Sequence, residues 1–396
     1  MEKVILFKKG IETLEFFSQE MGKALKEMGL QVFYYDLDEG EKSFLELQSF
    51  VEKGKSFVIS FNFNGLRGEE EFYNKEGRLF WKIKGIPCVN IMVDHPFYYA
   101  QSLEKVHREL GWDLYYQISI DMDHKKYMER FYPQIYKICF MPLAGTGLGY
   151  PFNKGREYDV VFTGNYTPPE HFHKYIERID EEYTLFYRKI IEYLISNPEI
   201  TMECAFEKFL LREMPEITNE ELVQCMENMI FIDLYVRFYY RGEVVKKLVE
   251  NGINVHVFGS DWRLLEIKDT NFLHIEGMAD SKECLVAMSK AKIALNVMPW
   301  FKKGAHDRVF NGMLNGAVVV TDKSEYLCKE LTKNEVSFYS LEHLDELPWK
   351  IKDLLENEEK RNCMTECAYS FAKKSHTWEN RAKFIYEWIT NTLSNL

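Results

Sequence analysis

Residues 304–322 read GAHDRVFNGMLNGAVVVTD, and this stretch carries the clearest signal of the fold. A glycine-containing loop leads into a short predicted helix with His306 and Arg308, and a turn at Gly316 leads into an apolar strand. The N–H groups and dipole of a helix N-terminus attract anions, and arginine can bind a diphosphate through paired hydrogen bonds. The stretch therefore predicts an anion site beside a buried strand. The alternative is that Arg308 pairs with a nearby carboxylate and Gly316 only closes a turn.

Short apolar runs alternate with longer segments of helical period on both sides of this stretch, as is typical of parallel α/β domains. Strands are expected in the second half of the chain at residues 158–163, 254–258, 272–276, 293–297, 317–321 and 336–340. Strands are expected in the first half at residues 4–7, 31–35, 56–61, 88–93, 114–119 and 136–141. The pattern predicts an α/β protein with two Rossmann-like lobes facing a cleft.

The glycine-rich segment 145–155, which contains Pro151, is interpreted as the linker between the lobes. The predicted domains are residues 1–150, residues 151–375 with a helical insertion at about 170–240, and a helix over 376–396 that can pack on the first lobe. The glycines at 145, 147 and 149 do not form a dinucleotide fingerprint, because Pro151 follows them and no helix opens there.

The composition excludes several classes of protein. The 396 residues are 46% hydrophobic and 28% charged, which favours folded domains over disorder. The net charge of −12 argues against a broad nucleic-acid-binding or anionic-membrane surface. The N-terminal apolar run is too short for a signal peptide, and no stretch is long enough to span a membrane, so a cytoplasmic location is expected.

Metal-binding patterns are weak. The eight cysteines include no CxxC pair. The DMDH segment at 121–124 is better explained as a helix N-cap than as a metal-binding Asp-x-Asp pair. His171 and His173 are two apart and do not share a helix face. No metal site is predicted.

Residues 304–322 resemble the nucleotide-sugar half-site of GT-B glycosyltransferases, in particular of the CgeB-like (spore-maturation) branch. The carrying residues are Arg308, Phe310, Gly316, Ala317 and the strand ending in Thr-Asp. Further segments that are similar in order are VDHPF (93–97), MPLAG (141–145), YDVVFTGNY (158–166), INVHVFGSDW (253–262) and SHTWENRA (375–382). The resemblance covers most of the chain outside about 170–240.

The resemblance implies transfer of a sugar from a nucleotide-diphosphate sugar, expected to be a UDP-sugar, to an acceptor hydroxyl of a protein, glycan or small molecule. No metal or other cofactor is expected, no nucleic-acid partner is expected, and self-association is left open. The predicted donor-binding residues are Gly164, Asn165, Gly259, Trp262, Asn296, His306, Arg308, Asn311, Gly316 and Asp322. Trp262 is a candidate for stacking on the base, with core packing as its alternative.

Two segments of the first lobe are candidates for the acceptor side. Asp94 and His95 directly follow an apolar strand, and either could take the proton of an acceptor hydroxyl. Neighbouring side chains on a strand point in opposite directions, so one of them is expected to be the base, with Asp94 favoured. Asn62 and Asn64 follow the third strand and could line the acceptor site, or could belong to an exposed turn.

The sequence departs from the usual retaining GT-B pattern. Glutamates are absent where Asn311 and Lys303 stand, which leaves the stereochemical outcome open. A nucleotide-sugar 2-epimerase shares the expected architecture and is one alternative function. A degenerate transferase that acts only as a binding module is the other.

Overall fold

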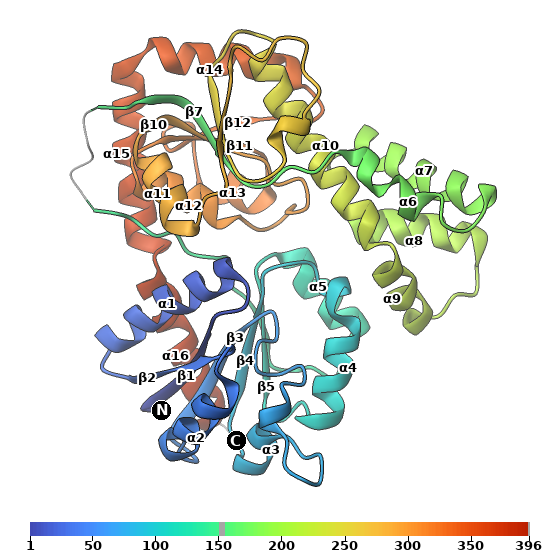
Figure 1. The fold of residues 1–396 in the computed structure, drawn as a ribbon, viewed down its shortest axis with the longest axis vertical. Coiled ribbons are helices and arrows are strands. Elements are labelled where there is room, and N and C mark those ends of the chain that lie inside the picture. Colours follow the sequence, from blue (N-terminus) through green and yellow to red (C-terminus); the bar gives the residue numbers. More distant parts are fainter. Residues whose placement is uncertain (150–154, 395–396) are drawn as a thin grey trace. The chain divides into compact units, whose positions relative to one another are not determined.

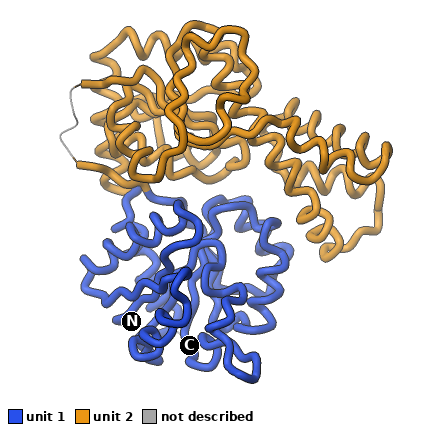
Figure 2. Tube along the Cα trace, viewed as in Figure 1, with its two compact units in different colours: residues 1–144, 376–396 blue, residues 145–375 orange. Residues whose placement is uncertain are grey.

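The computed structural model describes residues 1–149 and 155–394. The chain divides into two compact units, one formed by residues 1–144 with 376–396 and the other by residues 145–375 (Figure 2). Five of the eleven residues of the predicted linker, residues 150–154, are outside the described residues, and the predicted domain boundary between 150 and 151 falls among them.

The first unit is a parallel α/β sheet of order β2-β1-β3-β4-β5-β6 (Figure 1). Its strands are β1 (Lys3–Lys8), β2 (Gln31–Asp36), β3 (Ser56–Phe61), β4 (Cys88–Met92), β5 (Tyr115–Ser119) and β6 (Ile138–Phe140). Its helices are α1 (Glu12–Glu27), α2 (Gly40–Phe50), α3 (Phe80–Lys84), α4 (Ala100–Glu109), α5 (Met122–Phe131) and α16 (Trp378–Ser394), with 3₁₀ turns η1 (Glu70–Phe72) and η2 (Pro96–Tyr99). Strands β3, β4 and β5 are buried along their whole length, as expected for a sheet covered on both faces.

Helix α16 belongs to the first unit although it ends the chain. The ring of Trp378 lies 5.3 Å from that of Phe17 on α1, and Trp388 lies 5.4 Å from Tyr116 on β5. Arg381 donates hydrogen bonds to the carbonyls of Pro142 (2.6 Å) and Leu143 (3.0 Å). The Thr-Trp-x-x-Arg segment therefore fixes the end of β6 and the helix that returns to it.

The second unit is also a parallel sheet, of order β12-β11-β10-β7-β8-β9. Its strands are β7 (Tyr158–Thr163), β8 (Val255–Phe258), β9 (Leu273–Gly277), β10 (Ala291–Asn296), β11 (Val318–Asp322) and β12 (Val336–Tyr339). Its helices are α6 (His173–Ile176), α7 (Glu181–Ser196), α8 (Met202–Glu213), α9 (Asn219–Asn228), α10 (Ile230–Val249), α11 (Ser281–Ser289), α12 (Asp307–Leu314), α13 (Glu325–Glu330), α14 (Leu347–Glu356) and α15 (Glu358–Ser375). The 3₁₀ turns are η3 (Pro169–Phe172), η4 (Trp262–Leu264) and η5 (Leu344–Glu346).

These two sheets confirm the predicted fold class, two Rossmann-like α/β units. In the second unit the first strand, β7, lies between β8 and β10, so the strand order reverses there. Ligands of such sheets bind beyond the carboxyl ends of the strands at this reversal. In the first unit the corresponding point lies between β1 and β3.

The predicted insertion ends earlier than about residue 240. Helices α6–α9 extend away from the sheet, whereas α10 is the crossover helix that joins β7 to β8 (Figure 1). Several side chains of α10, including Val244, Val245 and Leu248, are fully buried. Residues near the C-terminal half of α10 therefore belong to the body of the unit and can reach its strand ends.

Candidate functional site

The predicted donor-binding residues gather at one end of the second unit's sheet. Gly164 and Asn165 follow β7, Gly259 follows β8, Asn296 ends β10, and Asp322 ends β11. Arg308 opens α12, which directly follows the loop after β10. The parallel sheet therefore brings these predicted residues to its carboxyl edge, around the reversal of strand order between β7 and β10.

The loops after β7 and β8 touch through their glycines. Gly259 has φ +146°, and a Cβ atom there would lie 2.5 Å from the carbonyl oxygen of Gly164. The side-chain oxygen of Asn165 accepts a hydrogen bond from the N–H of Ser260 at 3.0 Å. Only glycine permits this close approach, so Gly259 and Asn165 fix the two loops to each other.

Trp262 does not offer a face to a base. It is fully buried, its ring stacks on Tyr166 at 5.1 Å, and its indole N–H donates to the carbonyl of Gly164 at 2.8 Å. The prediction that Trp262 stacks on the nucleobase is wrong, because its ring is already covered by protein. Trp262 instead stabilises the loop that carries Gly164.

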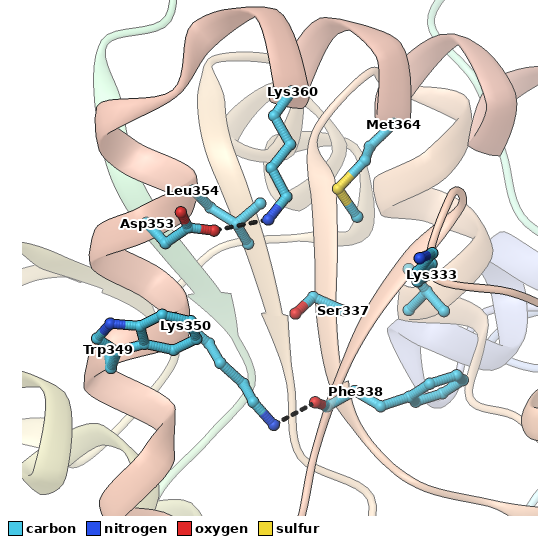
Figure 3. Close-up of a pocket in the computed structure, with 10 residues that line it drawn as sticks. Lys333, Ser337, Phe338, Trp349, Lys350, Asp353, Leu354, Lys360 and Met364 are labelled. Carbon is cyan, nitrogen blue, oxygen red and sulfur yellow. Dashed lines mark hydrogen bonds and ion pairs between the residues drawn. The ribbon is translucent and has the colours of Figure 1, made fainter.

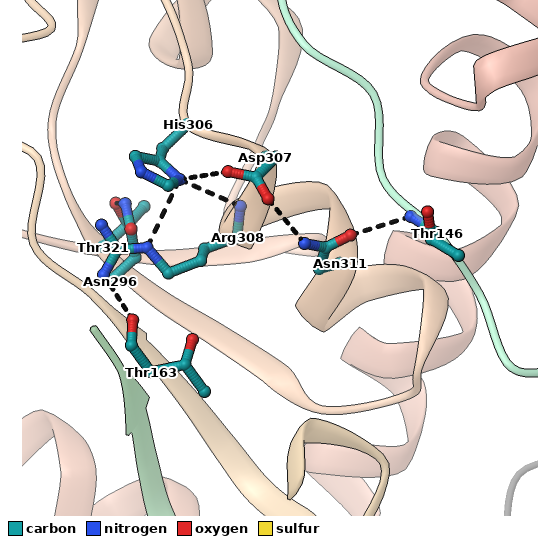
Figure 4. A network of polar contacts seen from close by, with 8 residues as sticks. All are labelled: Thr146, Thr163, Asn296, His306, Asp307, Arg308, Asn311 and Thr321. Carbon is teal, nitrogen blue, oxygen red and sulfur yellow. Dashed lines mark hydrogen bonds and ion pairs between the residues drawn. The ribbon is translucent and has the colours of Figure 1, made fainter. Parts of the chain in front are cut away.

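Arg308 is 6% exposed and is held by neutral groups. It donates to the carbonyl of Thr163 at 3.0 Å (Figure 4). Its guanidinium carbon lies 5.2 Å from the centre of the Phe162 ring. Its Nη2 is buried and has no hydrogen-bond partner among the described residues. Burial lowers the pKa of Arg308, and no carboxylate of the described residues forms an ion pair with it.

Arg241, on α10, is a second buried arginine and was not predicted from the sequence. It is 8% exposed, donates to the carbonyl of Asn165 at 2.8 Å, and lies 5.9 Å from the same Phe162 ring. Its Nε has no hydrogen-bond partner among the described residues. Burial, and then repulsion by Arg308 and Arg237, hold the pKa of Arg241 well below its ordinary value.

One turn before Arg241, Arg237 forms an ion pair with Asp233 at 2.9 Å. The half-buried Trp300 lies against both arginines, 4.2 Å from the guanidinium carbon of Arg237 and 5.3 Å from that of Arg241. The i, i+4 spacing of Asp233, Arg237 and Arg241 along α10 is the sequence signal that could have revealed this side of the site.

His306 caps α12 and sits between two charges. Its Nδ1 lies 2.5 Å from the carboxylate of Asp307 and 3.3 Å from Nε of Arg308 (Figure 4). Burial, followed by the charge of Arg308, lowers the pKa of His306 to about 4, so the ring is neutral at pH 7. Burial raises the pKa of Asp307, but contacts with His306 and Arg308 leave it below its ordinary value.

Asn296 and Asp322 lie at the carboxyl ends of the neighbouring strands β10 and β11. Asn296 donates to Thr321 Oγ1 at 2.9 Å, and its Oδ1 is buried with no partner among the described residues. Asp322 accepts from the N–H of Met298 at 2.9 Å, and burial raises its pKa to about 6. Burial thus disfavours the charged form of Asp322, whereas the charge of Arg308 favours it.

The side-chain amide of Asn311 forms hydrogen bonds within the protein. Its Oδ1 accepts from the N–H of Thr146 at 2.8 Å, and its Nδ2 donates to Asp307 at 2.9 Å (Figure 4). Both ends of its buried amide are therefore occupied within the protein, which does not favour its predicted place among the donor-binding residues. Gly316, with φ +71°, ends α12 and makes no contact that suggests ligand binding.

The first unit joins two of its four predicted polar residues, Asn62 and Asp94, by a hydrogen bond. Asn62 donates to Oδ2 of Asp94 at 3.1 Å and accepts from the N–H of Val93 at 2.9 Å. The hydroxyl of Tyr99, which was not predicted, donates to the same Asp94 oxygen at 3.1 Å. Asp94 is half-buried, so its carboxylate is oriented by two neutral donors while it remains open to solvent.

His95, Asn62 and Asn64 are more enclosed than expected. His95 is 6% exposed; its Nδ1 accepts from the N–H of Phe97, and its ring lies 4.5 Å from that of His124. These contacts favour Asp94 over His95 as the base. Asn62 and Asn64 are buried, which contradicts an exposed turn. Asn62 also has φ +48°, a strained backbone of the kind found at functional sites.

The patterns set aside as metal sites stay without support in the part of the chain that is described. Asp121 caps α5 and accepts from the N–H of Asp123 at 2.7 Å, which confirms the N-cap interpretation. Among the described residues, no group of three or more His, Cys, Asp or Glu side chains is placed to hold a metal ion. No helix in residues 1–149 or 155–394 combines the length and apolar character that crossing a membrane requires.

Comparison with known protein families gives one match, to part of the chain. Residues 241–387 match the model of a family described as glycosyl transferase-like, which is less than half of the chain. Arg241 and Arg308, the loop after β10 and α12 all lie within the matched segment. No match was found among the curated proteins.

The fold is shared with solved glycosyltransferases at low sequence identity. An alpha-glucosyltransferase in complex with UDP-glucose and abasic DNA is 13% identical, with a TM-score of 0.56 and coverage of 98% of this chain and 99% of its own. HepE from Anabaena, solved with UDP-glucose, is 10% identical, with a TM-score of 0.54 and full coverage of both chains. The chain spans 57% of the length of TarM, at 11% identity and a TM-score of 0.47 over 87% of this chain. The chain thus has the two-unit GT-B fold of glycosyltransferases and carries a glycosyl transferase-like domain at residues 241–387.

Proposed function

We propose that the protein is a glycosyltransferase whose second unit binds a nucleotide-diphosphate sugar. The observation that carries this proposal is the pair Arg241 and Arg308, both buried, both without a carboxylate partner among the described residues, at the strand reversal of the sheet. Two buried cations that repel each other are costly to fold, and an anion that accepts from both removes that cost. A diphosphate has the charge and the several acceptor oxygens that Arg241 Nε and Arg308 Nη2 require.

The same groups explain how the chemical step is assisted. When the bond between the sugar and the diphosphate breaks, negative charge grows on the departing phosphate oxygens. Fixed guanidinium groups in a low-dielectric site stabilise that charge more in the transition state than in the ground state. This assignment requires no metal, and metal independence is part of the proposal. The uridine nucleotide is proposed from the UDP-glucose complexes of the structural relatives.

The first unit is proposed to bind the acceptor and to supply the base. A sugar or side-chain hydroxyl is a weak nucleophile, and a carboxylate within hydrogen-bond reach can remove its proton as it attacks. Asp94 fits this task because Asn62 and Tyr99 both bind the same oxygen and hold the carboxylate in one orientation. Asn62 and Asn64 are proposed to help position the acceptor. Membership in the CgeB-like branch and the cytoplasmic location stay predictions.

The test is a panel of UDP-, GDP-, CMP- and dTDP-sugars, measured first by thermal shift and then by release of free nucleotide. A ligand that binds only the folded state raises the melting temperature. One nucleotide family should raise it and be turned over, and Asp94→Asn should keep the shift while lowering turnover by about 10²–10⁴-fold. Absence of any shift in a folded sample contradicts the proposal.

Two outcomes of this panel separate the alternative functions. A shift without turnover, unaffected by Asp94→Asn, identifies a binding module. A rearranged nucleotide sugar that forms without an acceptor identifies an epimerase.

A further inference from the structure

A pocket of about 370 Å³ lies on the second unit (Figure 3). It is built over β12, the outermost strand of the sheet, and against α14 and α15. It shares no residue with the strand-end site that holds Arg241 and Arg308. Any ligand of this pocket is therefore bound by a surface independent of the proposed function.

The most unusual lining residue is Trp349, which is 70% exposed. A tryptophan side chain carries a large apolar surface, and a bound ligand that covers it removes this surface from water. The negative face of its ring attracts groups with partial positive charge, such as the C–H bonds on one face of a pyranose. Leu354 and Met364 extend this apolar side of the pocket.

The remaining lining includes three lysines and one aspartate. Lys360 pairs with Asp353 at 2.6 Å, and Lys350 pairs with Glu346 at 3.3 Å and donates to the carbonyl of Phe338 at 3.1 Å. Lys333, on the opposite side of the pocket from Trp349 and Lys350, has no carboxylate partner among the described residues (Figure 3). The hydroxyl of Ser337 lies between the two sides and can donate or accept a hydrogen bond.

We propose that this pocket binds a saccharide that carries a carboxylate or a phosphate group. Trp349 provides the platform for the sugar ring, Lys333 binds the anionic group, and Ser337 hydrogen-bonds a ring hydroxyl. Protection of an unpaired strand edge explains Lys350, which covers the backbone of β12. That explanation accounts for neither the exposure of Trp349 nor the position of Lys333.

The test uses glucuronate and glucose 6-phosphate as probes, with glucose, acetate and inorganic phosphate as reference ligands. Binding to the full chain is measured by saturation-transfer NMR in the presence of saturating UDP, which keeps the probes out of the donor site. At least one charged sugar should bind with a Kd on the order of 1 mM, at least fivefold tighter than glucose or either free anion. Which charged sugar binds better distinguishes a carboxylate-specific from a phosphate-specific pocket.

The variants Trp349→Ala and Lys333→Met should each weaken binding at least fivefold. Both residues are exposed, so neither change is expected to unfold the protein. Lys352→Met, an exposed lysine of the same helix α14 that does not line the pocket, is the matched control and should bind as the wild type does. Equal binding of glucose, equal binding of the free anions, or a Kd unchanged by Trp349→Ala overturns the proposal.

Discussion

Arg241 and Arg308 keep their charges at positions where burial opposes them. Each guanidinium has exchanged water for one main-chain carbonyl, Asn165 or Thr163, and for the face of Phe162. Such contacts recover only part of the hydration free energy of a cation. This arrangement supports the proposal that the diphosphate of a donor supplies the missing negative charge.

The buried carboxyl of Asp322 should make the free energy of unfolding depend on pH. Burial raises its pKa from 3.8 to about 6, so between these values the folded protein keeps a proton that the unfolded chain has lost. The free energy of unfolding should therefore fall as pH rises through this window, by about 3 kcal/mol for a shift of about two units. The variant Asp322→Asn keeps an acceptor for Met298 and lacks this titration.

The measurement is urea unfolding of wild type and Asp322→Asn at several pH values from 3.5 to 7.5. The difference between them isolates Asp322, because His306, with a pKa lowered to about 4, changes stability in the opposite direction over nearly the same window. The Asn variant should gain relative to wild type as pH rises. A difference that stays constant with pH would show that Asp322 is not perturbed.

Some residues of the candidate site could be predicted from the sequence, and others could not. Arg308, Gly164, Gly259 and Asp322 follow from their places at strand ends, which the hydrophobic pattern reveals. The contacts of Trp262 and Asn311 could not be predicted, because their partners, Tyr166 and Thr146, are distant or lie in a linker with no pattern of its own. Arg241 and Trp300 were missed because a helix and a loop without recognisable motifs deliver them to the site.

At the scale of elements, the loops after β7 and β8 form one unit through Gly259. Gly259→Ala places a methyl group 2.5 Å from the carbonyl oxygen of Gly164 and keeps φ positive. The expected loss is at least about 3 kcal/mol in the free energy of unfolding, from steric overlap added to backbone strain. Gly277→Ala is the matched control, since Gly277 also has positive φ but has nothing within 4 Å of its added Cβ.

Urea unfolding of the two variants measures this difference. The control should lose only about 1 kcal/mol, the cost of an alanine at positive φ. Equal losses in both variants would contradict the close approach of the two loops.

Two asparagines near the end of helix α12 form hydrogen bonds with the backbone at the start of the second unit. Asn311 binds the N–H of Thr146, and Asn315 binds both the N–H of Leu148 and the carbonyl of Thr146. Asn311→Ala should lower the free energy of unfolding by about 2 kcal/mol, because it removes the hydrogen bonds from the N–H of Thr146 and to the carboxylate of Asp307. The Kd for the nucleotide sugar should change less than threefold.

Chemical unfolding and calorimetry of the same samples check this prediction, with Asn228→Ala, at an exposed asparagine, as the control. Tenfold weaker binding of the nucleotide sugar with unchanged stability would instead support Asn311 as a donor-binding residue.

The elements themselves were largely predictable, since every expected strand is present within a few residues. The exact ends were not, and neither was the boundary between the insertion and α10, because both segments are helical and carry no break in pattern.

At the scale of the whole molecule, the chain is built from two similar parallel sheets whose polar residues gather at carboxyl ends. The alternation of strands and helices was sufficient to predict this architecture, because parallel sheets need a crossover between successive strands. The division of tasks between the units is a proposal that rests on the chemistry of each one: buried cations in the second, and an oriented carboxylate in the first.

Calorimetric titration with UDP and UMP tests whether Arg241 and Arg308 bind a diphosphate. Wild type should bind UDP at least tenfold more tightly than UMP, since the second phosphate supplies the oxygens that the two guanidinium groups lack. In Arg241→Met and Arg308→Met this advantage should shrink to less than threefold, while Arg263→Met, an exposed arginine, keeps it. If UDP and UMP bind wild type equally, or if the advantage survives in both variants, the buried arginines are not a diphosphate site.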